Sequence, residues 1–318
     1  MAAERVVGTG DSSRIRRSAT NDTQLSLDEA LMKSRLLHRL PITVLSITFL
    51  SSFALAQAEG QKTFASEKEA LSSFIDAVRT DDTSQLQAIL GPDAKQITSS
   101  GDSVADNQER DRFLQKYETK HTLTSSGKNQ MTLNIGEDQW PVPIPLVHAG
   151  DKWHWDGAAG QQEILYRRIG HNELDAINVC KGVLSAQKDY AAEPHDGQPA
   201  GKYAAHIVSQ PGTQNGLYWS VKEGESPSPA GPMLANAAAQ GYDTSKRSPY
   251  HGYFYRMLNN PGGFGFVAYP AEYRNSGVMT FVMNQKGVIY EKDLGEKTSE
   301  VAESMTDYKI DSTWKPAK

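Results

Sequence analysis

The spacing of apolar residues changes along this chain, and these changes constrain the fold more than any other feature of the sequence. Between residues 64 and 120 apolar residues recur at helical spacing, whereas over 121–156 they alternate as strands do. The same order returns later, with a helical pattern over 171–191 and alternating segments from residue 250 onward. Helices that precede antiparallel strands predict an α+β fold, here in two domains.

We expect the first domain at residues 62–168 and the second at 169–318. In the first, Ser66 and Glu69 have the spacing of a capping box at the start of a helix. In the second, Asn172 is a suitable N-cap for the long helix that follows.

Ahead of these domains lies a segment that is typical of a secretory signal peptide. A basic stretch begins at Met32, residues 40–56 are almost wholly apolar, and alanines occupy the two candidate cleavage positions, Ala56 and Ala58. An apolar run of about 17 residues is short for a membrane helix, which needs about 20. We therefore expect an upstream extension and a signal peptide over residues 1–58. Cleavage would leave a periplasmic or secreted protein without a stable membrane span.

The charge of the mature chain argues against nucleic acid as a partner. The sequence has 33 basic and 38 acidic side chains, of which seven and five precede residue 57, so a formal charge of −7 remains. Binding to phosphates requires a basic surface instead. Cys180 is the single cysteine, so no internal disulfide forms, and its place in a helical apolar stripe predicts a buried side chain.

Motifs for metal or cofactor chemistry are not evident. The histidines of the mature chain are not spaced as metal ligands are. A phosphate-binding loop leads into a helix, whereas "PGGFGF" leads into a predicted strand. We therefore expect neither a metal nor a cofactor. Asp138 and His154 are the least unfavourable acid–base pair. If Trp153 and Trp155 point into the core, however, His154 points to the opposite face of its strand.

The stretch "YHGYFYRML", residues 250–258, concentrates side chains typical of contact sites. A regular strand would place His251, Tyr253 and Tyr255 on one face and Arg256 on the other. We expect the face with Arg256, which also carries Phe254 and Leu258, to pack on the long helix. The residues that we predict to bind a ligand or partner are His251, Tyr253, Tyr255 and Arg256.

Several stretches, including "FASEKEAL", "WPVPIPLV", "AAGQQEILYRRIGHNELDAI" and "SGVMTFVMNQKGVIYEKDLG", run in order between Phe64 and Trp314. Together they resemble a bacterial family of secreted proteins, the domain of unknown function 2950. The resemblance covers essentially the whole mature chain and implies an exported envelope protein, without assigning catalytic residues. "NNPGGFG" is shorter than the glycine-rich connection of that family, which puts in doubt any role for this loop.

Each half also resembles a broader class of domain. Short helices before strands, ending in "DKWHWDG", resemble the cone-shaped domains related to nuclear transport factor 2, which implies a pocket between sheet and helices. The long helix and small sheet of the second half resemble the globular heads of type IV pilin-like proteins. A filament subunit is not expected, because residues 171–191 are amphipathic and follow a whole domain.

These observations favour a non-catalytic binding or assembly module whose partner is an envelope protein or a small ligand. The alternative is a periplasmic hydrolase or isomerase that uses Asp138 and His154 in the pocket of the first domain.

Overall fold

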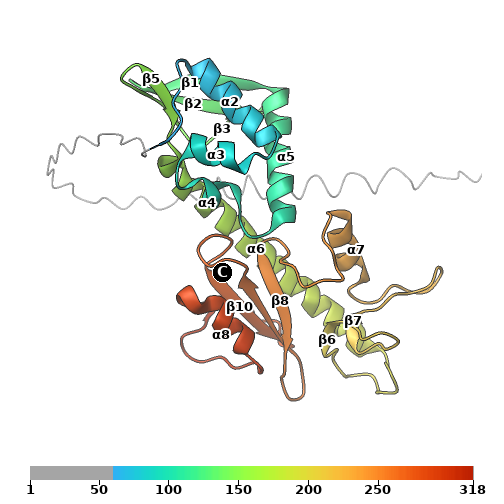
Figure 1. Cartoon of the computed structure of the whole chain (residues 1–318). Coiled ribbons are helices and arrows are strands. Elements are labelled where there is room, and N and C mark those ends of the chain that lie inside the picture. Colours follow the sequence, from blue (N-terminus) through green and yellow to red (C-terminus); the bar gives the residue numbers. More distant parts are fainter. Residues whose placement is uncertain (1–59, 318) are drawn as a thin grey trace, which may run out of the picture. The chain divides into compact units, whose positions relative to one another are not determined.

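The computed structural model describes residues 60–317 and confirms the predicted α+β class (Figure 1). The expected upstream extension and signal peptide, residues 1–58, lie outside the described residues. Within the described part, no helix has the length and apolar character needed to cross a membrane.

Helices come first in the N-terminal half, as the apolar spacing predicts. They are α2 (Glu67–Arg79), α3 (Thr83–Leu90), α4 (Ala94–Thr98) and α5 (Ser103–Thr119). Ser66 caps α2 as predicted, because its Oγ accepts a hydrogen bond from the Glu69 N–H at 3.2 Å. The return bond of the capping box is displaced by one residue, since Glu69 Oε2 accepts from the Ala65 N–H at 3.0 Å.

An antiparallel sheet follows these helices. Its strands are β1 (His121–Gly127), β2 (Gln130–Ile135), β3 (Trp140–Pro141), β4 (Leu146–Ala149) and β5 (Lys152–Trp155). They are ordered β1-β2-β4-β5, with β3 also paired to β2. The sheet and helices share a core around Trp155, whose ring lies 4.8 Å from that of Phe74 and whose Nε1 donates to the Ala70 carbonyl.

The long helix begins earlier than predicted. Helix α6 spans Gly157–Ala192, and its N-cap is Asp156, whose carboxylate accepts a hydrogen bond from the Ala159 N–H at 3.0 Å. The prediction of Asn172 as N-cap is wrong, since that residue lies inside the helix. Its amide is instead used in a tertiary contact, donating to the Ser276 carbonyl at 2.9 Å. The expected boundary between residues 168 and 169 therefore falls within one continuous helix.

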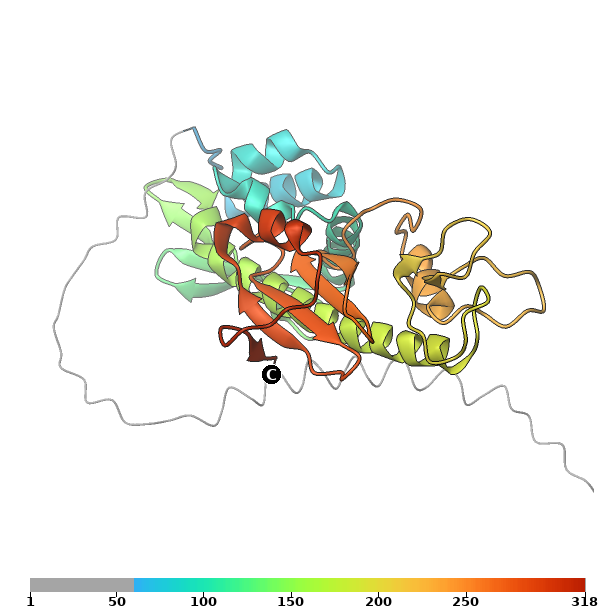
Figure 2. The ribbon, with the colours of Figure 1, turned by 90° about the horizontal axis from the view of Figure 1, so that it is seen from below.

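Beyond α6 the chain forms a parallel pair, β6 (His206–Val208) and β7 (Gly216–Tyr218), and then α7 (Gly231–Ala239). A second antiparallel sheet has the order β12-β11-β10-β9-β8. Its strands are β8 (Tyr253–Leu258), β9 (Gly265–Pro270), β10 (Met279–Asn284), β11 (Tyr290–Asp293) and β12 (Lys315–Pro316). Helix α6 packs on one face of this sheet, and α8 (Thr298–Ser304) packs on the other (Figure 2). Helix α8 follows a short 3₁₀ helix, η2 (Gly295–Lys297).

Side chains of the first half also bind the second half directly. Arg168 on α6 donates to the carbonyls of Gln96, Ile97 and Ser99, which lie in or just after α4, and to the Asn275 side chain. Asp102, the N-cap of α5, accepts hydrogen bonds from the Gly252 N–H and the Tyr242 hydroxyl. These bonds fix the position of the turn that leads into β8.

Candidate functional site

Asp138 and His154, the predicted acid–base pair, make no hydrogen bond with each other. Asp138 is exposed and pairs with Lys116 Nζ at 2.9 Å, and the hydrogen bond from that ammonium lowers the pKa of the carboxyl. His154 lies on β5 opposite Val147 and is only 3% exposed, so burial lowers the pKa of its imidazole. The carboxylate that opposes this shift is Asp156, not Asp138.

Both tryptophans of β5 contact the first core, and His154 therefore lies on the opposite face of the strand, as the alternation requires. That face is covered as well, because His154 is buried. Its Nδ1 has no hydrogen-bond partner among the described residues. The arrangement gives His154 neither an acid–base partner nor the access that a substrate would need.

His251 lies outside the strand on which the sequence pattern placed it. His251 and Gly252 have φ angles of 50° and 74°, so the backbone turns here and β8 begins at Tyr253. The imidazole Nδ1 contacts the Asp175 carboxylate of α6, and Nε2 lies 2.9 Å from Gln240 Oε1 after α7. His251 thus connects three segments and is separated from the face that carries Tyr253 and Tyr255.

Tyr253 and Tyr255 point toward α6 and belong to the core that contains Cys180. Tyr253 is fully buried, with its hydroxyl donating to the Met279 carbonyl at 2.9 Å. The Tyr255 hydroxyl donates to the Tyr250 carbonyl at 3.2 Å. Burial raises the pKa of both phenols, so neither is an acid–base group near neutral pH.

Arg256 faces the other side of the sheet, where its guanidinium donates to the carbonyls of Ala302, Glu303 and Met305 at the end of α8. Phe254 and Leu258 share this face and pack in the core around Trp314. The prediction that this face packs on the long helix is wrong. The opposite face does so, and its side chains Tyr253, Tyr255 and Met257 pack in the core that contains Cys180.

Cys180 is buried as predicted, and burial raises the pKa of its thiol to about 12. The thiolate that a nucleophile would require is therefore scarce at neutral pH. In residues 60–317 no three His, Cys, Asp or Glu side chains are grouped so that they could hold a metal ion.

A cavity of about 440 Å³ lies beside β8, between this strand, α6, β7 and α7. Its walls are mainly apolar, and the residues that form them include Val179, Val183, Leu217, Met233, Leu234, Ala237, Phe254 and Phe266. The cavity also touches three phenols, those of Tyr242, Tyr250 and Tyr255. The Tyr242 hydroxyl donates to Asp102, the Tyr255 hydroxyl donates to the Tyr250 carbonyl, and the Tyr250 hydroxyl interacts with the side chains of Gln240 and Asn236.

The rim of this cavity is polar and is formed by residues 243–248. Its charged side chains have partners of opposite sign, Lys246 with Asp243 at 3.1 Å and Arg247 with Glu303 at 2.8 Å. An apolar interior with a neutralised rim suits a ligand that is largely apolar and uncharged.

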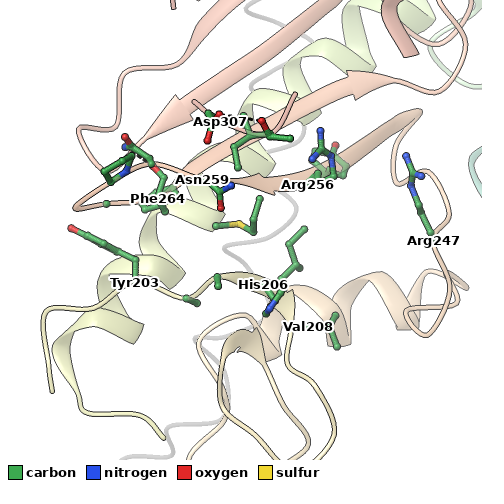
Figure 3. Close-up of a pocket in the computed structure, with 18 residues that line it drawn as sticks. Tyr203, His206, Val208, Arg247, Arg256, Asn259, Phe264 and Asp307 are labelled. Carbon is green, nitrogen blue, oxygen red and sulfur yellow. Dashed lines mark hydrogen bonds between the residues drawn. The ribbon is translucent and has the colours of Figure 1, made fainter. Parts of the chain in front are cut away.

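A second, larger space of about 1100 Å³ lies along the C-terminal part of β8, between this strand and the chain around β6 (Figure 3). Met257 and Asn259 border it from β8 and the residue that follows, and His206 and Val208 border it from β6. We call this space the β8 groove. It shares Tyr255, Ile207, Val208 and Arg247 with the apolar cavity, so the two spaces adjoin.

Of the predicted contact residues, only Tyr255 and Arg256 border these spaces. Sequence reasoning missed α7 as a wall, although Met233, Leu234 and Ala237 have the helical spacing that could have indicated one buried stripe. It also missed the pairing of His251 with Asp175, which lie 76 positions apart, and no local pattern carries that information.

Comparison with known proteins gives a family but no assigned activity. Residues 61–262 and 259–317 match the model of a family described as "Protein of unknown function (DUF2950)". No curated protein and no solved structure shows a significant match to the chain.

Proposed function

Since the chain belongs to this DUF2950 family, whose description names no activity, we propose its function from the site: it is an exported binding module that takes up a small, largely apolar ligand. The single observation that carries the proposal is the cavity of about 440 Å³ beside β8. Small-molecule sites are concave, mainly apolar and about 300–1,000 Å³ in volume.

The surrounding contacts support a preformed site. Tyr242 is held by Asp102, and Tyr255 is held by the Tyr250 carbonyl, so two of the aromatic walls have fixed orientations. Binding to such walls avoids much of the entropy that ordering a flexible site would cost.

Export is proposed from the sequence alone. The basic start at Met32, the apolar run and the alanines at 56 and 58 support cleavage and release into the envelope of a bacterium. Mass spectrometry of the protein from its own host should give a chain that begins at Gln57 or Glu59. A chain that retains residues before Met32 would contradict export by this signal.

The resemblances of the two halves are part of the proposal as well. Helices before a sheet support a relation of residues 62–168 to the nuclear transport factor 2-like cones, and α6 against a small antiparallel sheet supports a pilin-like head over 169–318. Separate hydrophobic cores in the two halves favour two domains. The acid–base alternative has less support, because Asp138 and His154 have different surroundings and no mutual hydrogen bond.

A neutral aromatic probe, N-phenyl-1-naphthylamine, tests the cavity. We expect saturable binding with increased probe fluorescence, and an affinity at least about tenfold weaker in Ala237→Trp, because the indole would fill the space. Ala235→Trp is the matched control, since Ala235 is an exposed residue of the same helix that does not line the cavity.

Equal affinity of the two tryptophan variants would contradict the cavity as the site, provided that both retain the circular dichroism of the wild type. If Ala237→Trp does not fold, Val183→Phe offers a second way to fill the cavity from α6. Absence of saturable binding to the wild type would also contradict the proposal.

A further inference from the structure

One exposed segment, residues 243–248, lies between the apolar cavity and solvent. All of its residues line the cavity, and all of them are exposed. A residue with both properties separates the cavity from the surrounding water. Apart from Val208, the other described residues that line the cavity are buried or partly buried. We call residues 243–248 the strap.

The strap is anchored at both ends. Before it, the Tyr242 N–H donates to the Ala237 carbonyl at 3.1 Å, and the Tyr242 hydroxyl donates to Asp102. After it, the Tyr250 N–H donates to the Tyr253 carbonyl at 2.8 Å. A movement of the strap is therefore confined to the residues between these two anchors.

Most bonds of the strap are made within it. The backbone N–H and the hydroxyl of Ser245 both donate to the Asp243 carboxylate, which also pairs with Lys246. In the part of the chain that the structure describes, Arg247 is the one strap residue with a hydrogen bond or ion pair to another segment. Its side chain thus holds the middle of the strap against the protein.

Arg247 contacts the second sheet and α8. Its guanidinium pairs with Glu303 at 2.8 Å and donates to the Tyr269 hydroxyl. The same group lies over the ring of Phe254, 5.0 Å from the ring centre. Both charged side chains are more than half exposed, and an exposed ion pair or cation–π contact stabilises only weakly. A strap that depends on one such residue opens at small cost.

We propose that the strap is a gate of the apolar cavity and that Arg247 is its latch. The inference rests on the proposed function, because it concerns how a ligand reaches the same cavity. When Arg247 leaves Glu303 and Tyr269, the strap moves away from the cavity while Tyr242 and Tyr250 stay in place. When the contacts form again, the closed strap retains the ligand. Salt screens an exposed ion pair, so the gate opens more at high ionic strength.

A cysteine placed in the cavity measures this opening without any ligand. Val183 lines the cavity and is 4% exposed, so the thiol of Val183→Cys should react with the neutral reagent dithiodipyridine only when the gate is open. Adding Glu303→Gln should raise the labelling rate at least about threefold, because the amide forms no ion pair with Arg247. Glu303 does not line the cavity, so its replacement leaves the walls unchanged.

Two controls separate opening of the gate from other effects. Glu300→Gln changes an exposed residue of the same helix that pairs with Lys297, and it should label at the rate of Val183→Cys alone. Cys180 is fully buried and does not line the cavity, so its labelling reports unfolding of the core and should not change with Glu303→Gln. Added salt should accelerate labelling of Val183→Cys and have little effect once Glu303 is replaced.

Stopped-flow binding of N-phenyl-1-naphthylamine relates the gate to ligand exchange. Glu303→Gln should raise the association and dissociation rate constants by the same factor, at least about threefold, because one gate controls both entry and exit. The Kd should therefore stay within about twofold of the wild-type value. Faster labelling of Val183→Cys without saturable binding of this probe would support the gate and contradict the proposed function.

Two results would overturn the gate. One is an equal labelling rate of Val183→Cys with Glu303→Gln and with Glu300→Gln, when both proteins retain the circular dichroism of the wild type. Ligands would then enter by another route, such as the adjoining β8 groove. The other is an equal acceleration of Cys180 labelling, because unfolding of the core would then explain the access. If Val183→Cys does not fold, Ala237→Cys places a thiol in the same cavity.

Discussion

Replacing Asp102 by alanine is expected to lower the free energy of unfolding by about 3–5 kcal/mol. Asp102 is 1% exposed, and its carboxylate accepts from the N–H groups of Ala105 and Gly252 and from the Tyr242 hydroxyl. Alanine would leave these donors without an acceptor and would remove the N-cap of α5. Urea unfolding followed by circular dichroism measures the change.

Asp111→Ala is the matched control for this variant. Asp111 belongs to the same helix but is exposed, so its loss should change stability by no more than about 0.5 kcal/mol. If the Asp102→Ala and Asp111→Ala variants have the same free energy of unfolding, the result contradicts the role of Asp102 in joining α5 to the turn before β8.

The second large effect is expected for Trp155→Ala, with a loss of about 3–5 kcal/mol. Trp155 is fully buried in the first core, beside Phe74, and its indole N–H donates to the Ala70 carbonyl at 3.1 Å. Alanine would leave a large cavity and an unused acceptor. Urea unfolding should therefore show a clearly lower midpoint.

An exposed aromatic residue provides the comparison for Trp155. Tyr166 on α6 is 63% exposed, and Tyr166→Ala should lie within about 0.5 kcal/mol of the wild type. Because Trp155 does not line the apolar cavity, binding of N-phenyl-1-naphthylamine to the folded variant should be unchanged. A loss below about 1 kcal/mol would show that the first core does not depend on this indole.

The elements that local patterns specify were predictable. The capping box at Ser66, the helical spacing that leads to α5 and the hairpin of β1 and β2 each follow from residues close together in the chain. The start of α6 was not predictable in the same way. Asn172 has the chemistry of an N-cap, but a contact with Ser276, more than a hundred residues away, uses its side chain instead.

The site depends still more on distant contacts. Alternation correctly separates Tyr255 from Arg256, but it does not indicate which face α6 covers. Two consecutive positive φ angles at His251 and Gly252 end the regular strand pattern, so His251 meets Asp175 and leaves the face of Tyr255. The cavity and the β8 groove arise from segments between residues 179 and 307, which no single sequence window contains.

The central claim is that the chain binds a ligand in the cavity beside β8, and methyl NMR tests it most directly. With ¹³C-labelled methionine methyl groups, Met233 reports on the cavity and Met131 on the first sheet. Titration with N-phenyl-1-naphthylamine should shift the Met233 signal to saturation and leave that of Met131 in place. An unmoved Met233 signal under saturating probe would contradict the claim.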